Sequence, residues 1–182
     1  GSVREAVRPQ EVAEAARALQ GLGAEALCIF FVNSYANHAN ERAALEAARA
    51  VWHNEHVVAS SEILPEIREF ERASTTALNG YLQPIIGRYL RDLEEKLREG
   101  GFGGDMLIMQ SNGGVMSVET ARRLPIRTAL SGPAAGVTAA AYIASAAGFP
   151  DVITCDMGGT SFDVSLVTGG VHAMVPGTSV DF

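Results

Sequence analysis

The stretch TCDMGGTSFDVSLV, residues 154–167, places acidic residues on both sides of a glycine pair within an apolar, β-branched run. Asp156 precedes Gly158 and Gly159, and Asp163 follows them. A glycine bend lets backbone N–H groups approach an anion, because no Cβ blocks the way. Carboxylates repel a polyphosphate but hold a hydrated Mg²⁺ that bridges to phosphate oxygens. The pattern predicts a metal–nucleotide clamp, and the alternative is a plain β-hairpin whose aspartates cap turns.

Two further segments have the composition of ligand-binding loops. Ser111–Gly114 (SNGG) follows an expected strand at its carboxyl end, where open α/β sheets place ligands. The alternative is a glycine turn capped by Asn112. Ser131-Gly132-Pro133 opens an expected helix whose first N–H groups could face an anion, although such a sequence is more often a plain helix start.

Composition and charge exclude several classes of function. The chain has 182 residues, of which 47% are apolar and 19% charged, so we expect a folded core. A net charge of −7 argues against a nucleic-acid partner. No apolar stretch approaches the ~20 residues of a membrane helix, so we expect a cytoplasmic protein with no membrane partner. Cys28 and Cys155 lie in apolar runs without metal-type spacing and are expected as buried thiols, while the four histidines are expected to be solvated or hydrogen-bonded.

Helices and strands are expected to alternate along the chain. Apolar periodicity predicts helices at 11–22, 40–52, 66–99, 117–123 and 133–147. Short apolar runs predict strands at 26–32, 57–61, 105–110, 126–130, 152–156, 162–167 and 171–175. Pro84 removes a helical hydrogen bond, so a kink or a break is expected near Leu82. This alternation predicts an α/β fold, with parallel strands in its first part.

Several sequence blocks resemble known families. DMGGTSFDVSLV resembles the second phosphate-binding hairpin of the actin-like ATPases, and GPAAGVTAAAYIA, residues 132–144, resembles the helix before that hairpin, with Gly132 where the chaperones of that superfamily have a glutamate. LPEIREFERASTTALNGYLQPIIGRYL, LIMQSNGGVMS, RTALSGPAAGV and ITCDMGGTSFDVSLV resemble, in this order, blocks of the hydantoinase A/5-oxoprolinase family.

This resemblance implies a fragment of the actin-like ATPase (ribonuclease H-like) fold, with a mixed sheet, flanking helices and a hairpin phosphate loop. Residues 1–65 would be the C-terminal part of the N-terminal hydantoinase/oxoprolinase domain. Residues 66–182 would begin the second domain, which carries the hairpin. The family's chains are several times longer, and their first phosphate hairpin has no counterpart here, so the chain alone is expected to be inactive.

The resemblance also assigns site residues. Asp156 and Asp163 would act in catalysis and hold Mg²⁺ through water, with Asp156 orienting the attacking oxygen near the γ-phosphate. The expected phosphate-binding residues are Gly158, Gly159, Thr160, Ser161 and Gly132. The expected substrate contacts are Ser111, Asn112, Gly113, Gly114 and Arg72, the last within the FERAS block.

The function implied is ATP-dependent opening of a cyclic amide such as hydantoin or 5-oxoproline, by phosphorylation of the amide oxygen. ATP and Mg²⁺ would be the cofactors, with K⁺ as a further candidate cation, and a B-type subunit or a second copy of the chain would be partners. Three alternatives stay open: a non-catalytic nucleotide-binding switch, a sugar or acyl kinase, and an ATP-dependent carboxylase subunit.

Overall fold

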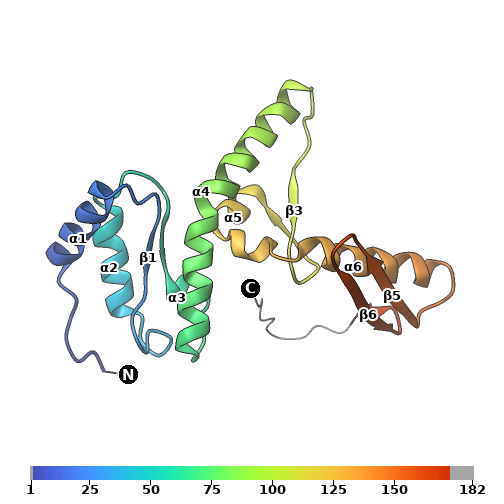
Figure 1. Ribbon diagram of the computed structural model, residues 1–182, viewed down its shortest axis with the longest axis horizontal. Coiled ribbons are helices and arrows are strands. Elements are labelled where there is room, and N and C mark those ends of the chain that lie inside the picture. Colours follow the sequence, from blue (N-terminus) through green and yellow to red (C-terminus); the bar gives the residue numbers. More distant parts are fainter. Residues whose placement is uncertain (1, 173–182) are drawn as a thin grey trace. The chain divides into compact units, whose positions relative to one another are not determined.

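The computed structural model describes residues 2–172, which form two compact units (Figure 1). The first unit contains the chain up to Asp105 together with Val118–Ile126. The second contains Met106–Ser117 and the chain from Arg127 onward. The long helix at 69–99 therefore belongs to the same unit as the residues before it. The domain division predicted from the sequence falls instead after residue 65. That division stays a prediction about sequence domains.

The first unit begins with the predicted α/β alternation. Its first four elements are α1 (Pro9–Gly21), β1 (Leu27–Ile29), α2 (Ala39–Arg49) and β2 (Val57–Ala59). The strands pair in parallel, with Leu27 opposite Val57, which confirms the expected wiring. Both strands are shorter than predicted. The buried core between helices and strands consists of Ala16, Ile29, Ala44, Leu45, Ala48, Trp52, Val57 and Ala59.

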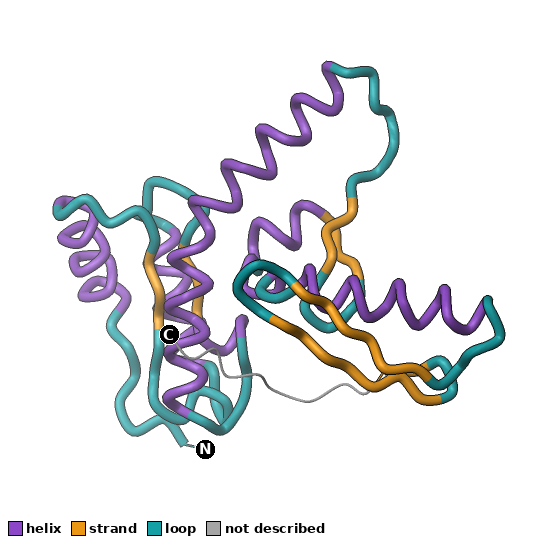
Figure 2. Tube along the Cα trace, turned by 45° about the vertical axis from the view of Figure 1, so that its right-hand side comes forward, coloured by secondary structure: helices purple, strands orange, loops and turns teal. Residues whose placement is uncertain are grey.

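The rest of the first unit is helical and contains α3 (Ser60–Ile63), α4 (Glu69–Glu99) and α5 (Val118–Arg123). A break in α4 was one expected outcome, but α4 is one continuous 31-residue helix with Pro84 inside it. Its axis bends partway along, as Figures 1 and 2 both show. Asn79 and Gln83 donate side-chain hydrogen bonds of 3.1 and 3.0 Å to the Arg123 carbonyl at the end of α5. These two hydrogen bonds attach α4 to the end of α5 close to Pro84, which has no backbone N–H to donate.

The second unit contains small antiparallel sheets and one helix. Its elements are β3 (Leu107–Met109), β4 (Val115–Ser117), α6 (Ser131–Ala146), β5 (Val152–Met157), β6 (Phe162–Thr168) and β7 (Val171–His172). The strand predicted at 126–130 is wrong, because residues Pro125–Thr128 form a 3₁₀ turn, η1. Pro125 is buried and cannot donate to a strand ladder. The strand predicted at 171–175 is present at Val171–His172, and its remainder lies outside the described residues.

The register of β5 and β6 gives their sheet two different faces. Val152 pairs with Val167, and the buried Val167 lies on the face that α6 covers (Figure 2). The other face carries exposed apolar side chains: Ile153, Cys155, Met157, Phe162, Val164 and Leu166. Cys155 is therefore exposed, which corrects the expectation of a buried thiol there. Cys28 is also exposed as a residue, although its sulfur lies against α4 and donates to the Thr76 carbonyl at 3.3 Å; both are free cysteines. Within residues 2–172, no helix has the length and apolarity needed to cross a bilayer.

Candidate functional site

The two predicted metal-binding carboxylates lie directly opposite each other. Asp156 on β5 pairs in register with Asp163 on β6, one position before the final pair of the ladder. Residues paired in this way have Cβ atoms about 4.5–5.5 Å apart, with side chains on the same face. Both aspartates are exposed, so their carboxylates reach solvent at the turn end of the hairpin. Spacing in the sequence predicted an acid on each arm, and the register brings the two acids together.

The turn between the two strands is exposed and only partly free to bind an anion. Gly158 donates its backbone N–H to the Ser161 carbonyl at 2.9 Å, which closes the turn. The N–H of Gly158 is therefore occupied in this structure, and contact between Gly158 and phosphate stays a prediction. At Gly159, an added Cβ would meet no atom within 4 Å. Protein packing does not require a glycine at this position, and the space beside it is open to a ligand.

Helix α6 begins beside the hairpin. An added Cβ at Gly136 in the second turn of α6 would lie 3.9 Å from Asp156 Oδ2, so this carboxylate faces the N-terminal half of the helix. No side chain caps the start of α6, and Leu130 before it has a left-handed φ of 60°. An added Cβ at Gly132 would meet nothing within 4 Å. The carboxylate pair and an uncapped helix start are thus parts of one unit, and the anion contact expected at Gly132 stays a prediction.

The Ser111–Gly114 loop forms the asparagine-capped glycine turn that was the alternative to a ligand-binding loop. Asn112 Oδ1 accepts the Gly114 N–H at 2.9 Å, which makes the expected asparagine-capped turn. Gly113 has a φ of 81°, and an added Cβ there would lie 2.9 Å from Thr138 Oγ1 on α6. His172 Nε2 lies 3.4 Å from the same Cβ position. The loop therefore packs against α6 and β7, and contact with substrate at these residues stays a prediction.

No sequence signal pointed to His172 as a neighbour of this loop. Its spacing to the other histidines lacks a metal pattern, and strand β7 that carries it is far along the chain from Gly113. Only the folded sheet brings the imidazole beside the glycine turn.

Arg72 is buried within the first unit. Its side chain is 0% exposed and forms an ion pair with Glu69. The guanidinium also donates to the carbonyls of Phe31 at 2.8 Å and Glu66 at 3.1 Å, and it lies 4.9 Å from the Phe30 ring centroid. These contacts engage the guanidinium within the first unit, and contact between Arg72 and a substrate stays a prediction.

Comparison with known proteins gives relatives for nearly the whole chain. Caprolactamase subunit alpha of Pseudomonas jessenii is 38% identical over 80% of this chain and 21% of its own length. Acetone carboxylase beta subunit of Xanthobacter autotrophicus is 34% identical over 90% of this chain and 23% of its own length. 5-Oxoprolinase of Saccharomyces cerevisiae is 33% identical over 90% of this chain and 13% of its own length. The chain thus spans a quarter or less of these relatives.

A solved structure supports the same relationship. The crystal structure of ATP-dependent caprolactamase from Pseudomonas jessenii superposes with a TM-score of 0.78 at 32% identity, over 91% of this chain and 24% of the other. This likeness confirms the predicted α/β fold. The hydantoinase/oxoprolinase family model matches residues 72–181, more than half of the chain. The chain therefore belongs to the hydantoinase/oxoprolinase family.

Proposed function

We propose that this chain is part of an ATP-dependent enzyme that opens a cyclic amide, and that the β5–β6 hairpin supplies one of its nucleotide contacts. The observation that carries the proposal is the register pair Asp156–Asp163 beside an exposed glycine turn. Relatives named 5-oxoprolinase and caprolactamase support the class of substrate. A solved relative described as an ATP-dependent caprolactamase supports the use of ATP.

The carboxylate pair suits a Mg²⁺ ion that keeps most of its water ligands better than it suits a metal ion coordinated only by protein side chains. Among residues 2–172, no group of three or more His, Cys, Asp or Glu side chains is placed to hold a metal ion. Two exposed carboxylates leave most coordination positions to water and phosphate oxygens, which is the arrangement that Mg²⁺ prefers in nucleotide sites. Asp156 and Asp163 would therefore hold a hydrated Mg²⁺ between the hairpin and the nucleotide. K⁺ as a second cation stays a prediction.

The turn and the helix start would bind the phosphates themselves. With the Gly158 N–H occupied, the backbone donors left to the turn are those of Gly159, Thr160 and Ser161. The open space at Gly159 and at Gly132 allows a phosphate oxygen to approach the backbone closely. Backbone donors held in place before the reaction stabilise developing negative charge without reorganising.

The bound nucleotide would supply a phosphoryl group to the amide oxygen, which would make the ring carbon more electrophilic. Water would then add to that carbon, and the C–N bond would break with the ring nitrogen leaving as the amine. Asp156 faces the N-terminal half of α6, and it would orient the attacking oxygen through a water or metal-bound water. Because the chain spans a quarter or less of its relatives, further contacts to the nucleotide and to the ring, beyond those predicted for the hairpin and for Ser111–Gly114, would come from elsewhere in a longer protein. The chain alone would then be inactive, as expected from the sequence.

A carboxylase subunit is the second candidate, because one relative is named acetone carboxylase beta subunit. The caprolactamase and acetone carboxylase relatives are both named as subunits, which supports a partner chain for the longer protein. One experiment separates the candidates: the full-length protein, with its partner, is assayed for ADP release with hydantoin, 5-oxoproline or caprolactam, and with acetone plus bicarbonate. Release stimulated by a cyclic amide supports the first proposal, and release that needs a ketone and bicarbonate supports the second. Release that no substrate stimulates would contradict both and favour a nucleotide switch.

A further inference from the structure

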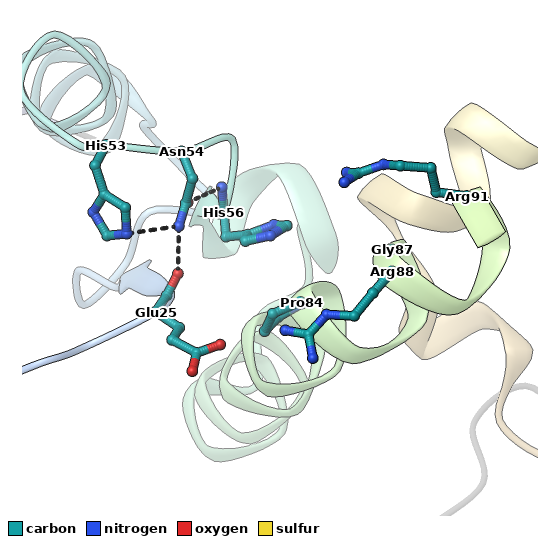
Figure 3. A pocket seen from close by; sticks show the side chains of 8 residues that line it. All are labelled: Glu25, His53, Asn54, His56, Pro84, Gly87, Arg88 and Arg91. Carbon is teal, nitrogen blue, oxygen red and sulfur yellow. Dashed lines mark hydrogen bonds between the residues drawn. The ribbon is translucent and has the colours of Figure 1, made fainter.

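The first unit contains a hollow that the proposed chemistry does not use. It has a volume of about 330 Å³ and lies between the turn before β2 and the second half of α4 (Figure 3). The residues that line it are Glu25, His53, Asn54, His56, Pro84, Gly87, Arg88 and Arg91. All of them belong to the same compact unit. The volume falls at the lower end of the range for small-molecule pockets.

One wall of the hollow is fixed by the hydrogen bonds of Asn54. Its Oδ1 accepts the indole N–H of Trp52 at 3.1 Å and the backbone N–H of His56 at 2.8 Å. Its Nδ2 donates to the Glu25 carbonyl at 3.0 Å and lies 3.0 Å from His53 Nε2. Figure 3 draws the contacts of Asn54 with Glu25, His53 and His56, which engage the backbone of His56 and one ring nitrogen of His53. A preorganised wall reduces the entropy cost of binding.

The opposite wall is cationic. Arg88 and Arg91 extend from α4 toward the side of the hollow where His56 and Glu25 lie (Figure 3). Among the described residues, none forms a hydrogen bond or an ion pair with the Arg88 side chain. Arg91 has only a distant ion pair of 3.9 Å with Glu55, whose carboxylate Arg122 holds at 2.6 Å. Two guanidinium groups thus face this hollow with little compensation, in a chain whose net charge is −7.

Gly87 provides the space between the two walls. It is buried, and a Cβ there would meet only the His56 ring, at 3.9 Å from Cε1. Burial, with the nearby Arg122 and Arg91, lowers the pKa of His56 against the opposing effect of Glu55, so this imidazole is neutral at pH 7 and can donate one hydrogen bond. Guanidinium forks bind planar or tetrahedral oxyanions through paired hydrogen bonds.

We propose that this hollow binds a small organic oxyanion, a phosphate ester or a carboxylate, which Arg88 and Arg91 hold from α4. The hollow is larger than an oxyanion alone, so the ligand carries a small organic body that occupies the space beside Gly87 and Pro84. Glu25 sets the polarity of the far end, where a cationic or hydrogen-bonding group of the ligand would lie. This proposal does not depend on the hairpin chemistry, since every residue it uses lies in the first unit.

The test is a titration of the full chain at low ionic strength with two probes, inorganic phosphate and butyrate, a monocarboxylate whose short chain adds no second charge near Glu25. Binding is followed by calorimetry and by the NMR signals of the Asn54 side-chain amide and the His56 backbone amide. Saturable shifts at these two amides are expected with at least one probe, and the tighter probe identifies the phosphate or carboxylate class. The absence of any shift up to about 10 mM of both probes would overturn the proposal, because such binding would be too weak to matter.

Matched variants separate this site from general charge attraction. Arg88→Gln or Arg91→Gln removes one charge-assisted contact and is expected to weaken binding about tenfold or more. Arg98→Gln removes the same charge from an exposed position near the end of α4, where the arginine has only a 3.8 Å contact with Glu94, and is expected to change affinity less than about twofold. Glu25→Gln removes a repelling carboxylate and is expected to tighten binding. Equal losses from Arg88→Gln and Arg98→Gln would contradict the assignment.

Discussion

Glu41 and Arg72 form hydrogen bonds with the backbone N–H and the backbone carbonyl of the same residue, Phe31. Glu41 Oε1 accepts the Phe31 backbone N–H at 2.8 Å, and Arg72 Nη2 donates to the Phe31 carbonyl at 2.8 Å. Both charged side chains are 0% exposed. The segment they hold follows β1, at the carboxyl end of the parallel strand pair, and it contains Asn33 with a left-handed φ of 61°. Two buried charges therefore fix the backbone of this loop at Phe31.

Glu41→Gln is expected to destabilise the first unit by about 2 kcal/mol at pH 7, because it weakens charge-assisted hydrogen bonds. Burial raises the pKa of Glu41, but hydrogen bonds from Ser60, Ser61 and Phe31 outweigh this effect and hold the pKa below its ordinary value. A carboxyl group whose pKa is lower in the folded state stabilises that state at pH values above the unfolded-state pKa. This stabilisation is lost as the pH falls through the folded-state pKa. The variant and the parent protein should therefore converge in stability below about pH 4.

Urea unfolding at pH 7 and at about pH 3, below the ordinary glutamate pKa, measures this difference. Glu46→Gln, on the exposed side of the same helix α2, serves as the control and should leave stability within about 0.5 kcal/mol. A difference between Glu41→Gln and the parent that grows as pH falls would show that the sign of this argument is wrong.

Asp156→Asn is expected to reduce ATP turnover by the full-length protein about a hundredfold or more, because it removes a carboxylate from the proposed Mg²⁺ pair. Stability should change little, since Asp156 is exposed. The measurement is substrate-stimulated ADP release together with thermal unfolding. Asp92→Asn, an exposed aspartate on α4, is the matched control and should keep full turnover. Equal turnover in the Asp156 and Asp92 variants would remove the hairpin from the proposed site.

The sequence was a good guide to elements with strong local patterns. Apolar periodicity located α1, α2 and α6 closely, and the glycine pair between acidic residues predicted the β5–β6 hairpin. The strand predicted at 126–130 failed because tertiary contacts override an apolar run. Pro125 is buried there, and Asn79 Oδ1 accepts the Ile126 N–H at 3.3 Å. Local preference does not reveal such a contact between residues far apart in the chain.

The site was predictable in composition but not in geometry. Residue types and spacing predicted acids on both arms of the hairpin, yet only the register shows that Asp156 and Asp163 face each other. The occupied N–H of Gly158 follows from the way the turn closes, which spacing alone does not determine. Arg72 was predicted to face a ligand because of its family block, and its burial depends on Phe30, Phe31 and Glu69 around it.

Gly159→Ala and Gly113→Ala are expected to have opposite consequences. A Cβ at Gly159 meets no protein atom, so this variant should unfold like the parent but bind nucleotide at least about tenfold more weakly in the full-length protein. Gly113 has a φ of 81° and little room beside Thr138, so its variant should lose about 1–3 kcal/mol of stability. Thermal unfolding and nucleotide titration of both variants measure the two effects. A strongly destabilised Gly159→Ala would mean that the turn needs glycine for folding, and its space would no longer support a ligand.

Gly80→Ala is expected to destabilise the first unit, because the new Cβ would lie 2.3 Å from Cys28 Sγ. The thiol lies against α4 and donates to the Thr76 carbonyl at 3.3 Å, and burial of the sulfur raises its pKa. We expect a loss of about 1–3 kcal/mol. Cys28→Ala removes the colliding atom, so the double variant Cys28→Ala, Gly80→Ala should recover most of that loss. Urea unfolding of both single variants and the double variant measures the coupling. Additive losses would show that β1 and α4 do not pack in this way in solution.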